Sequence, residues 1–582
     1  MTFNKILAGL GLAVCVMQPV SAGLPSGVSS GDTTETSTVL WARSVAGNVE
    51  FKVTDAGNVV FQQVVPIVNQ VIPAKVSVTN LVPGKTYSYQ VTSPTGVVGK
   101  GTFKTAAAAP STPAVSFGVT GDWRGELAPY PAIKNVPATA LDFFVKLGDT
   151  IYADYPTYAV PLPQARTLKD YRYKQREVYN AHSGVNALAN VQKNVSIFAT
   201  IDDHEVTNDF AGGAPAPGNA LFPETTGLIN QTALYNNGLQ AFIEYNAIED
   251  KRYPIVGNSL TDGRPDLYRT QRYGNTAAIY MLDERSFRDK ELTGVSDITN
   301  ATQIGTFIAN SFDIGKPTTR TMLGKPQLDR LKADLSSAQA DGVIWKFVMI
   351  PEPIQNLGVL AASDRYEGYA SERSELLRYI DENHIKNVVF VSADIHGTIT
   401  NDLTYQRRED VLSALINFGN PLLAPQVKTS AFEITTGSVA FEPAFGDSVI
   451  GLLSFLPNGN ALLGQLFAAV GVADLAGFNA LPMPVKNLAM EGLINQQLTP
   501  LGYTPVGLQD NSSIDAHVLQ GGSTALFSFG WTKFDIKPDT HALEITTYGI
   551  KTYTQQDIAN NVAEVKSRTP EIVNKLLVNP QP

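Results

Sequence analysis

Cysteine is almost absent from this chain of 582 residues. The only one, Cys15, lies in an apolar N-terminal stretch. An internal disulfide is therefore excluded, and so is a Cys nucleophile or a Cys–metal bond anywhere later in the chain. Histidine is also scarce, with six residues in total, so a metal site in this protein would have to rely mainly on other side chains.

Basic residues are outnumbered by acidic ones. The chain has 44 Lys and Arg against 54 Asp and Glu, for a formal net charge of -10. This balance argues against a nucleic-acid-binding patch. Beyond the N-terminus, no stretch is long and apolar enough to be a convincing transmembrane helix. We therefore expect no stable membrane span in the mature chain, while the oligomeric state stays unknown.

The first 22 residues have the pattern of a secretory signal peptide. Lys5 provides a weakly positive start, residues 6–16 are apolar, and Val20-Ser21-Ala22 offers small residues for cleavage. No Arg-Arg pair is present, so a twin-arginine export route is not indicated. We predict a secreted or periplasmic protein that loses its only cysteine on cleavage.

Two regions with different patterns of predicted secondary structure follow the signal segment. Residues 23–109 contain short β-rich runs separated by turn residues, which predicts a small all-β sandwich domain. From residue 110 on, apolar strands alternate with helical stretches, which predicts one α/β layered domain over 110–582. Residues 411–483 are almost uncharged and form an apolar insert; we favour buried packing helices there, with an apolar cap over a pocket as the alternative.

Residues 141–152 contain the clearest candidate site of the second region. An apolar strand stops at Gly148, and the carboxylate of Asp149 follows at once. Glycine allows a sharp turn, and the ends of strands are where open α/β sheets place their sites. Tyr152 lies three residues later, close enough to face the same point.

The same arrangement recurs at three further strand ends. Each of the three strands, at 115–120, 195–200 and 388–392, is followed by a carboxylate. The residues concerned are Asp122, Asp203 with His204, and Asp394 with His396. Four similar strand ends favour a common site over four separate capped turns.

Oxygen donors that converge at strand ends are typical of a site for hard metal ions. Two metal ions about 3.5–4 Å apart can hold both a nucleophile and a phosphoryl group, and a bound metal lowers the pKa of water from 15.7 towards about 7. Asp149 is the natural bridge. The other candidates are Asp122, Tyr152 and His396 for one metal, and Asp203 and Asp394 for a second.

Five further residues that can carry charge need an interpretation. His204 is placed to assist the leaving group or to stabilise the charge of the transition state. Arg124, two residues after Asp122, is our candidate for a phosphate contact. Asp283 with Arg285 and Arg288 is interpreted as a structural group.

The motifs at 148–152, 202–209 and 392–396, in this order along the chain, resemble those of the calcineurin-like metallophosphoesterases. More narrowly, they resemble the PhoD-type alkaline phosphatase and phosphodiesterase family. The resemblance implies an α/β metallophosphoesterase domain of mixed β sheets with flanking helices, preceded by a fibronectin/Ig-like sandwich. It also implies a secreted, metal-dependent enzyme that hydrolyses phosphate esters by metal-activated hydroxide.

The resemblance also bears on the metals. It implies Fe(III), with Tyr152 as an iron ligand similar to that of the purple acid phosphatases, and Ca(II) as its partner. The family often has a Cys iron ligand in its first motif, and this chain has none, nor has it twin arginines. Metal identity therefore stays open, and another divalent metal also suits the second site.

Three alternatives to a general phosphate esterase stay open at this point. One is a phospholipase-like phosphodiesterase that acts on lipid head groups, with the apolar insert in contact with lipid. Another is a catalytically inactive secreted binding protein whose sandwich domain carries the function. A glycosidase with two carboxylates is conceivable, but it would not need the Tyr or the Asp–x–His pattern.

Overall fold

The computed structural model describes residues 23–456 and 458–582. The predicted signal segment, residues 1–22 with Cys15, lies outside the described residues. Within the described part of the chain, the helices are too short or too polar for any of them to cross a membrane.

Three sheets make up the β structure. The first has ten strands, in the spatial order β17 (Asp515–Gln520), β21 (Glu571–Asn579), β20 (Leu543–Lys551), β19 (Ser528–Ile536), β8 (Val115–Thr120), β9 (Phe143–Leu147), β10 (Ser196–Thr200), β1 (Val28–Gly31), β2 (Thr38–Ala42) and β5 (Ala74–Val78). The second has seven, in the order β11 (Arg269–Tyr273), β12 (Ala277–Met281), β13 (Trp345–Met349), β14 (Val388–Ser392), β16 (Val427–Thr435), β15 (Thr398–Tyr405) and β18 (Thr524–Ala525). The third has four, in the order β4 (Asn58–Ile67), β3 (Gly47–Asp55), β6 (Thr86–Thr92) and β7 (Val98–Lys104).

Helices occupy the connections between these strands. The α-helices are α1 (Leu168–Tyr179), α2 (Ala187–Gln192), α3 (Ala233–Tyr245), α4 (Ala301–Ser311), α5 (Lys325–Ala340), α6 (Ala370–Glu382), α7 (Arg408–Phe418), α8 (Phe445–Leu453), α9 (Gly459–Ala469), α10 (Leu475–Asn479), α11 (Met483–Leu498) and α12 (Gln555–Ser567). The short 3-10 helices are η1 (Gly125–Leu127), η2 (Pro131–Ile133), η3 (Val136–Ala138), η4 (Ile229–Gln231), η5 (Tyr366–Tyr369), η6 (Pro421–Leu423) and η7 (Thr499–Leu501).

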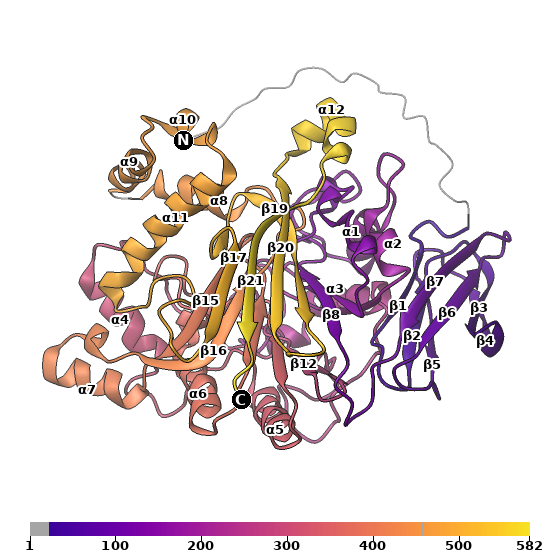
Figure 1. Cartoon of the computed structure of the whole chain (residues 1–582), viewed down its shortest axis with the longest axis horizontal. Coiled ribbons are helices and arrows are strands. Elements are labelled where there is room, and N and C mark those ends of the chain that lie inside the picture. The colour runs from indigo at the N-terminus through magenta and orange to yellow at the C-terminus, as the bar shows by residue number, and fades with distance from the viewer. Residues whose placement is uncertain (1–22, 457) are drawn as a thin grey trace.

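The two large sheets pack face to face. Their shared core contains Phe117 and Val145 from the ten-stranded sheet and Phe347 and Val391 from the seven-stranded sheet. Helices α1, α2 and α3 contribute to a second core on the other face of the ten-stranded sheet, and α5 and α6 contribute to a third on the other face of the seven-stranded sheet. Figure 1 shows the strands in the middle of the molecule, with strands β1–β7 at one end. The region after the N-terminal strands is therefore an α/β structure of layered mixed sheets.

Parallel strands lie at the centre of both large sheets. Strands β8, β9 and β10 are parallel in one, and β12, β13, β14 and β16 are parallel in the other. Strands buried on both faces consist almost entirely of apolar residues, which explains why the sequence predicts β8 and β14 with their observed bounds. Since parallel strands all end at one edge of a sheet, the turns that follow them come together there.

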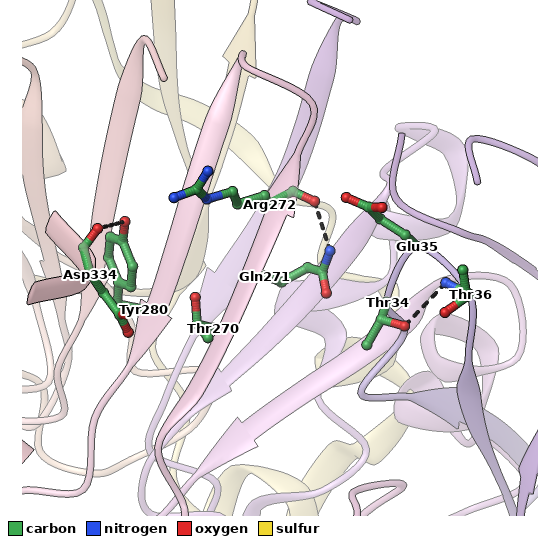
Figure 2. Close-up of a pocket in the computed structure, with 8 residues that line it drawn as sticks. All are labelled: Thr34, Glu35, Thr36, Thr270, Gln271, Arg272, Tyr280 and Asp334. Carbon is green, nitrogen blue, oxygen red and sulfur yellow. Dashed lines mark hydrogen bonds between the residues drawn. The ribbon is translucent and has the colours of Figure 1, made fainter. Parts of the chain in front are cut away.

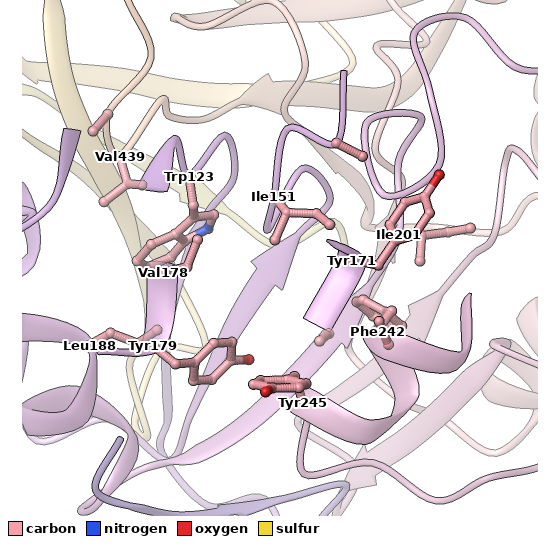
Figure 3. Close-up of a cluster of buried hydrophobic side chains, with 14 of the residues drawn as sticks. Trp123, Ile151, Tyr171, Val178, Tyr179, Leu188, Ile201, Phe242, Tyr245 and Val439 are labelled. Atoms are coloured by element: carbon pink, nitrogen blue, oxygen red, sulfur yellow. The ribbon is translucent and has the colours of Figure 1, made fainter. Parts of the chain in front are cut away.

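Apolar residues anchor these turns. Trp123, Ile151 and Ile201 each lie within two residues of a predicted site residue, and all three are buried in the core beside α1, α2 and α3. Figure 3 shows them together with Tyr171 and Phe242 from that core. The acidic edge of the sheet is thus fixed from behind by apolar packing.

The N-terminal strands are continuous with the rest of the fold. Strand β1 pairs in parallel with β10 through Gly31 and Ile197, so β1, β2 and β5 extend the ten-stranded sheet. A Cβ atom at Gly31 would lie 2.5 Å from the Ile197 carbonyl oxygen, so this contact requires glycine. A separate apolar core, with Leu40 and Phe51 among its members, lies between these strands and the four-stranded sheet.

The predicted apolar insert, 411–483, is not a single unit. Strand β16 lies within it and is an inner strand of the seven-stranded sheet. Helices α8–α11 instead share a peripheral apolar core with Phe527, and they leave large apolar side chains exposed, including Phe455 at 87% and Leu488 at 70%. The structure differs here from the favoured prediction of buried helices, because each short helix has only one face against that core.

Glu433 of β16 connects three strand ends. Its side chain is fully buried and accepts hydrogen bonds from the Ile354 and Gln355 amides at 2.9 and 2.7 Å and from the Ser392 hydroxyl at 2.7 Å. Burial raises the pKa of Glu433 to about 7, against the effect of these donors. The carboxyl group therefore fixes the turns that follow β13 and β14.

Replacing Glu433 with Ala should leave those three buried donors without a partner. Each such group costs about 1–3 kcal/mol, so we expect a lower midpoint in urea unfolding and a loss of at least about 2 kcal/mol. Glu571→Ala is the matched control, because Glu571 is exposed and surface changes usually stay within about 0.5 kcal/mol. Equal midpoints for the two variants would contradict the role given to Glu433.

Candidate metal centre

Three of the four predicted strand ends contain residues in an unusual backbone conformation; the turn after β10 does not. Asp122, Asp149, Asp394 and His396 have φ angles of 64°, 48°, 60° and 59°. Aspartate tolerates this left-handed region better than most residues, but it is still sparsely populated. Strained positions of this kind cluster at functional sites when the surrounding structure holds them in place.

Glu205 holds two of these turns together. Its buried carboxylate accepts hydrogen bonds from the amides of Asp149 at 3.1 Å, Thr150 at 2.6 Å and Asp202 at 2.8 Å. Gly148, with a φ of 79°, allows the close approach, because a Cβ there would lie 2.7 Å from the Asp202 Cβ. Glu205 was not among the predicted site residues, although it directly follows His204 in the Asp-Asp-His-Glu run.

Three groups of potential ligand atoms lie at the common edge of the two sheets. In each group, one atom from every residue lies within 4.8 Å of the others. The first group is Asp122, Asp149 and His396; the second is Asp149, Asp203 and His204; the third is Asp202, Glu352 and Asp394. Asp149 belongs to the first two groups, which is the position expected of a bridging ligand.

Tyr152 lies at the first group. Its hydroxyl oxygen is 3.4 Å from Nε2 of His396, and that nitrogen is 3.8 Å from Oδ1 of Asp122. Burial, together with the carboxylates of Asp149 and Asp122, raises the pKa of the Tyr152 phenol well above its usual value. Burial lowers the pKa of His396 to about 3, which leaves a neutral imidazole that can coordinate a metal.

The third group differs from the predicted arrangement. Asp394 was expected beside Asp203, but the structure groups it with Asp202 and Glu352. Neither of these two was a predicted site residue. Glu352 follows the buried strand β13, so the strand-end rule applied to residues 345–352 would have found it, and Asp202 directly precedes Asp203.

Arg285 explains how the third group is held. It is fully buried; its Nε lies 2.5 Å from Asp202 Oδ1, and its guanidinium also contacts Glu352 and Asp364. Burial opposes the charge of Asp364, but Arg285 and Arg288 lower the pKa of that carboxyl group well below its usual range. Arg285 thus orients acidic side chains, in line with its interpretation as a structural residue.

His204 lies in a hydrogen-bonded pair with Asp154. Its Nδ1 is 2.7 Å from Asp154 Oδ1, and Asp154 Oδ2 accepts a hydrogen bond from the Asn208 amide at 2.9 Å. Burial opposes the charged imidazolium, but Asp203, Asp149 and Asp154 together raise the pKa of His204 well above its usual value. Asp154 was also missed, although it lies only five residues after Asp149.

Arg124 lies at the edge of the centre. Its guanidinium pairs with Glu126 at 2.6 Å and donates to the Glu442 carbonyl at 3.1 Å. It also lies over the rings of Tyr155 and Phe441, 4.9 and 5.4 Å from their centroids. Phe441 in turn stacks on His396 at 3.7 Å, so Arg124 borders an aromatic wall beside the first group.

The hydrogen bonding of the buried carboxylates shows whether these residues suit metal ions. Both oxygens of Asp122, Oδ1 of Asp203, Oδ2 of Asp202 and Oε2 of Glu352 are buried without a hydrogen-bond partner among the described residues. Burial raises the pKa values of Asp122, Asp149 and Asp394 well above their usual range. Bound cations would neutralise these charges and supply the missing partners, so the donors fit metal ions.

A cavity of about 430 Å³ lies elsewhere, at the junction of the N-terminal strands with β11. Its lining residues include Thr34 and Glu35 on one side and Thr270 and Arg272 on the other (Figure 2). Arg272 is paired with Asp341 at 2.6 Å, and none of the metal-centre carboxylates lines this cavity. This cavity is therefore separate from the candidate metal centre.

Comparisons with known proteins agree with this geometry. Residues 120–450 match the sequence model of the PhoD-like phosphatases, and residues 12–107 match that of the PhoD-like phosphatase N-terminal domain. Alkaline phosphatase D of Bacillus subtilis (strain 168) is 26% identical over 455 residues, which cover 68% of this chain and 70% of that protein.

The fold agrees as well. A solved structure of PhoD superimposes with a TM-score of 0.65 and 18% identity, over 97% of this chain and 94% of that one. The chain therefore belongs to the PhoD-like phosphatase family and is a metal-dependent phosphoesterase.

Proposed function

We propose that this protein is an exported alkaline phosphatase or phosphodiesterase whose metal ions are held at the sheet edge by the carboxylates of the three groups, with Tyr152 and His396, while His204 is not a ligand. The observation that carries the proposal is the shared position of Asp149, which belongs to two of the groups. A carboxylate shared by two metal sites matches the two-metal arrangement used to hold both partners of a phosphoryl displacement. The proposed substrate is a phosphate ester.

The ligand sets suggest different ions. Asp122, Asp149, Tyr152 and His396 would hold Fe(III), because only a strongly charged ion would ionise a phenol whose pKa burial has raised. Asp203, with Asp149, would hold Ca(II) or another divalent ion. Carboxylate oxygens suit calcium better than zinc.

The third set contains the last predicted ligand. Asp394, with Asp202 and Glu352, supplies only carboxylate oxygens, so it too suits calcium. When bound, the metals would supply Lewis acidity toward the phosphoryl group and a hydroxide nucleophile at neutral pH.

His204 and Asp154 supply the proton chemistry. Burial opposes the charged form, but Asp203, Asp149 and Asp154 raise the pKa of His204, and a protonated imidazole at this place can donate a proton to the leaving oxygen or stabilise its negative charge. Asp154 accepts from Nδ1 and directs Nε2 toward Asp203, 3.9 Å away. Arg124 is the proposed contact for an outer phosphate oxygen, in competition with its Glu126 partner.

The remaining proposals concern the N-terminal parts of the chain. We propose that residues 23–109 form a fibronectin-like sandwich domain, supported by the seven strands between residues 28 and 104 and the apolar core between them. Residues 1–22 are proposed to be a signal peptide, which places the mature enzyme outside the cell or in the periplasm.

The first test combines metal analysis with activity. Asp149→Asn should lose about two equivalents of bound metal relative to wild type, whereas Asp122→Asn should lose about one, because Asp149 contributes to two groups. Elemental analysis should be run alongside a panel of phosphate monoesters and diesters, with exposed Asp515→Asn as the control. A metal-free wild-type protein with full activity would overturn the proposal.

The second test concerns proton transfer. His204→Ala should lower kcat by roughly 10²–10⁴ and leave metal content nearly unchanged, and Asp154→Asn should lower kcat by roughly 10–100-fold. The exposed His517→Ala is the control. Loss of metal in step with activity in His204→Ala would show that His204 is a ligand and not an acid.

The third test concerns Tyr152. A phenolate bound to Fe(III) gives the protein a visible charge-transfer band, and Tyr152→Phe should abolish that band while the other ligands retain most of the metal. Absorption and metal content should be recorded on the same samples, with Tyr155→Phe as the control. A colourless, active wild-type enzyme without iron would refute ligation by Tyr152.

A further inference from the structure

Helices α8, α9, α10 and α11 form a peripheral unit with an exceptional composition, which we call the apolar helical cluster (445–498, without 457). Residues 448–473 contain no Asp, Glu, Lys or Arg. Asp447, just before this run, and Lys486 carry opposite charges; burial raises the pKa of Asp447, and the charge of Lys486 partly opposes this effect. The cluster therefore offers solvent a nearly neutral surface.

This surface is apolar as well as uncharged. Phe455 is 87% exposed and Leu488 70%, and Leu452, Leu475 and Val485 are exposed to a lesser degree. Between α9 and α11 lies a groove of about 1030 Å³, whose walls include Leu466, Val470 and Leu488. Exposed apolar patches of this kind mark sites of association with other molecules or with membranes.

The composition favours lipid over protein as the partner. Protein interfaces concentrate their binding energy in Trp, Tyr and Arg, and residues 445–498 contain none of the three, nor any His. Binding to anionic lipids needs clusters of Lys or Arg, whereas Lys486 is the only basic residue of the cluster and the protein has a net charge of -10. The surface thus complements neutral lipids.

The cluster is directly joined to the metal centre. The Phe445 amide at the start of α8 donates to the His396 carbonyl at 3.1 Å. Ile395, between Asp394 and His396, packs in the same apolar core as Ile450 of α8. Phe441, four residues before α8, stacks on His396. Figure 1 shows α9, α10 and α11 projecting at one end of the molecule, with α8 between them and the sheets.

We propose that the apolar helical cluster docks on the surface of a neutral lipid bilayer and brings the metal centre to phosphoesters of lipid head groups. The exposed side chains would enter the boundary between head groups and acyl chains without crossing it, as amphipathic surface helices do. The choice of lipid phosphoesters as substrates rests on the proposed function; docking itself does not.

The test uses the full chain and phosphatidylcholine vesicles in a flotation assay. Wild type should float with the vesicles, and the double variant Phe455→Asp/Leu488→Asp should lower the partition coefficient at least about tenfold, because it removes two large apolar groups from the contact. Ile255→Asp is the matched control, since Ile255 is 83% exposed outside the cluster. Circular dichroism should show that all three proteins are equally folded.

Activity assays separate this proposal from the proposed function. Hydrolysis of a soluble phosphate ester should be the same in wild type and the double variant, while hydrolysis of a phosphoester embedded in vesicles should fall with binding. Flotation needs no turnover, so an inactive metal centre would leave the docking result valid.

Three results would overturn the docking proposal. One is a wild type that stays unbound, and another is a preference for phosphatidylglycerol vesicles over phosphatidylcholine. The third is a dimer in analytical ultracentrifugation that the double variant abolishes without any vesicle binding, which would identify a second copy of the chain as the occupant.

Discussion

Uncompensated negative charge at one edge of the two large sheets is the constraint on which the rest of this structure depends. Three groups of acidic and histidine side chains lie there, and several of their buried oxygens lack a hydrogen-bond partner among the described residues. Such charges are costly in a low-dielectric interior. Bound cations would offset this cost, so these clusters are compatible with metal binding.

The surrounding frame keeps the acidic groups from moving apart. Glu205 ties the turn after β9 to the turn after β10, and Glu433 ties the turns after β13 and β14 to β16. Arg285 supplies a buried positive charge to the third group. Trp123 and Ile151 anchor their turns in the core behind the site. These contacts hold Asp122, Asp149, Asp394 and His396 in their left-handed backbone conformation.

The same edge connects the centre to a very different surface. Asp394 and His396 face the acidic groups, whereas Ile395 between them packs into the core of helices α8–α11. A single turn therefore joins the most polar and the most apolar parts of the molecule.

Local sequence determined the parallel strands and the site residues that follow them. Strands at 115–120 and 388–392 are continuous apolar runs, and Asp122, Asp149 and Asp394 follow such runs directly, so the pattern is visible within a few residues. The absence of cysteine from the later chain and the scarcity of histidine likewise pointed to a site rich in carboxylates. These features depend only on residues close together in the sequence, so they can be predicted from a single sequence.

Tertiary structure alone decided how those residues are grouped. Asp394 lies with Asp202 and Glu352 because β14 pairs with β13, a strand more than 40 residues away. Asp154 orients His204 across 50 residues, and β16 enters the sheet although its surroundings resemble an insert. The exposure of Phe455 depends on what packs beside it. Each of these outcomes is set by contacts between distant segments, which local patterns of hydrophobicity and charge do not encode.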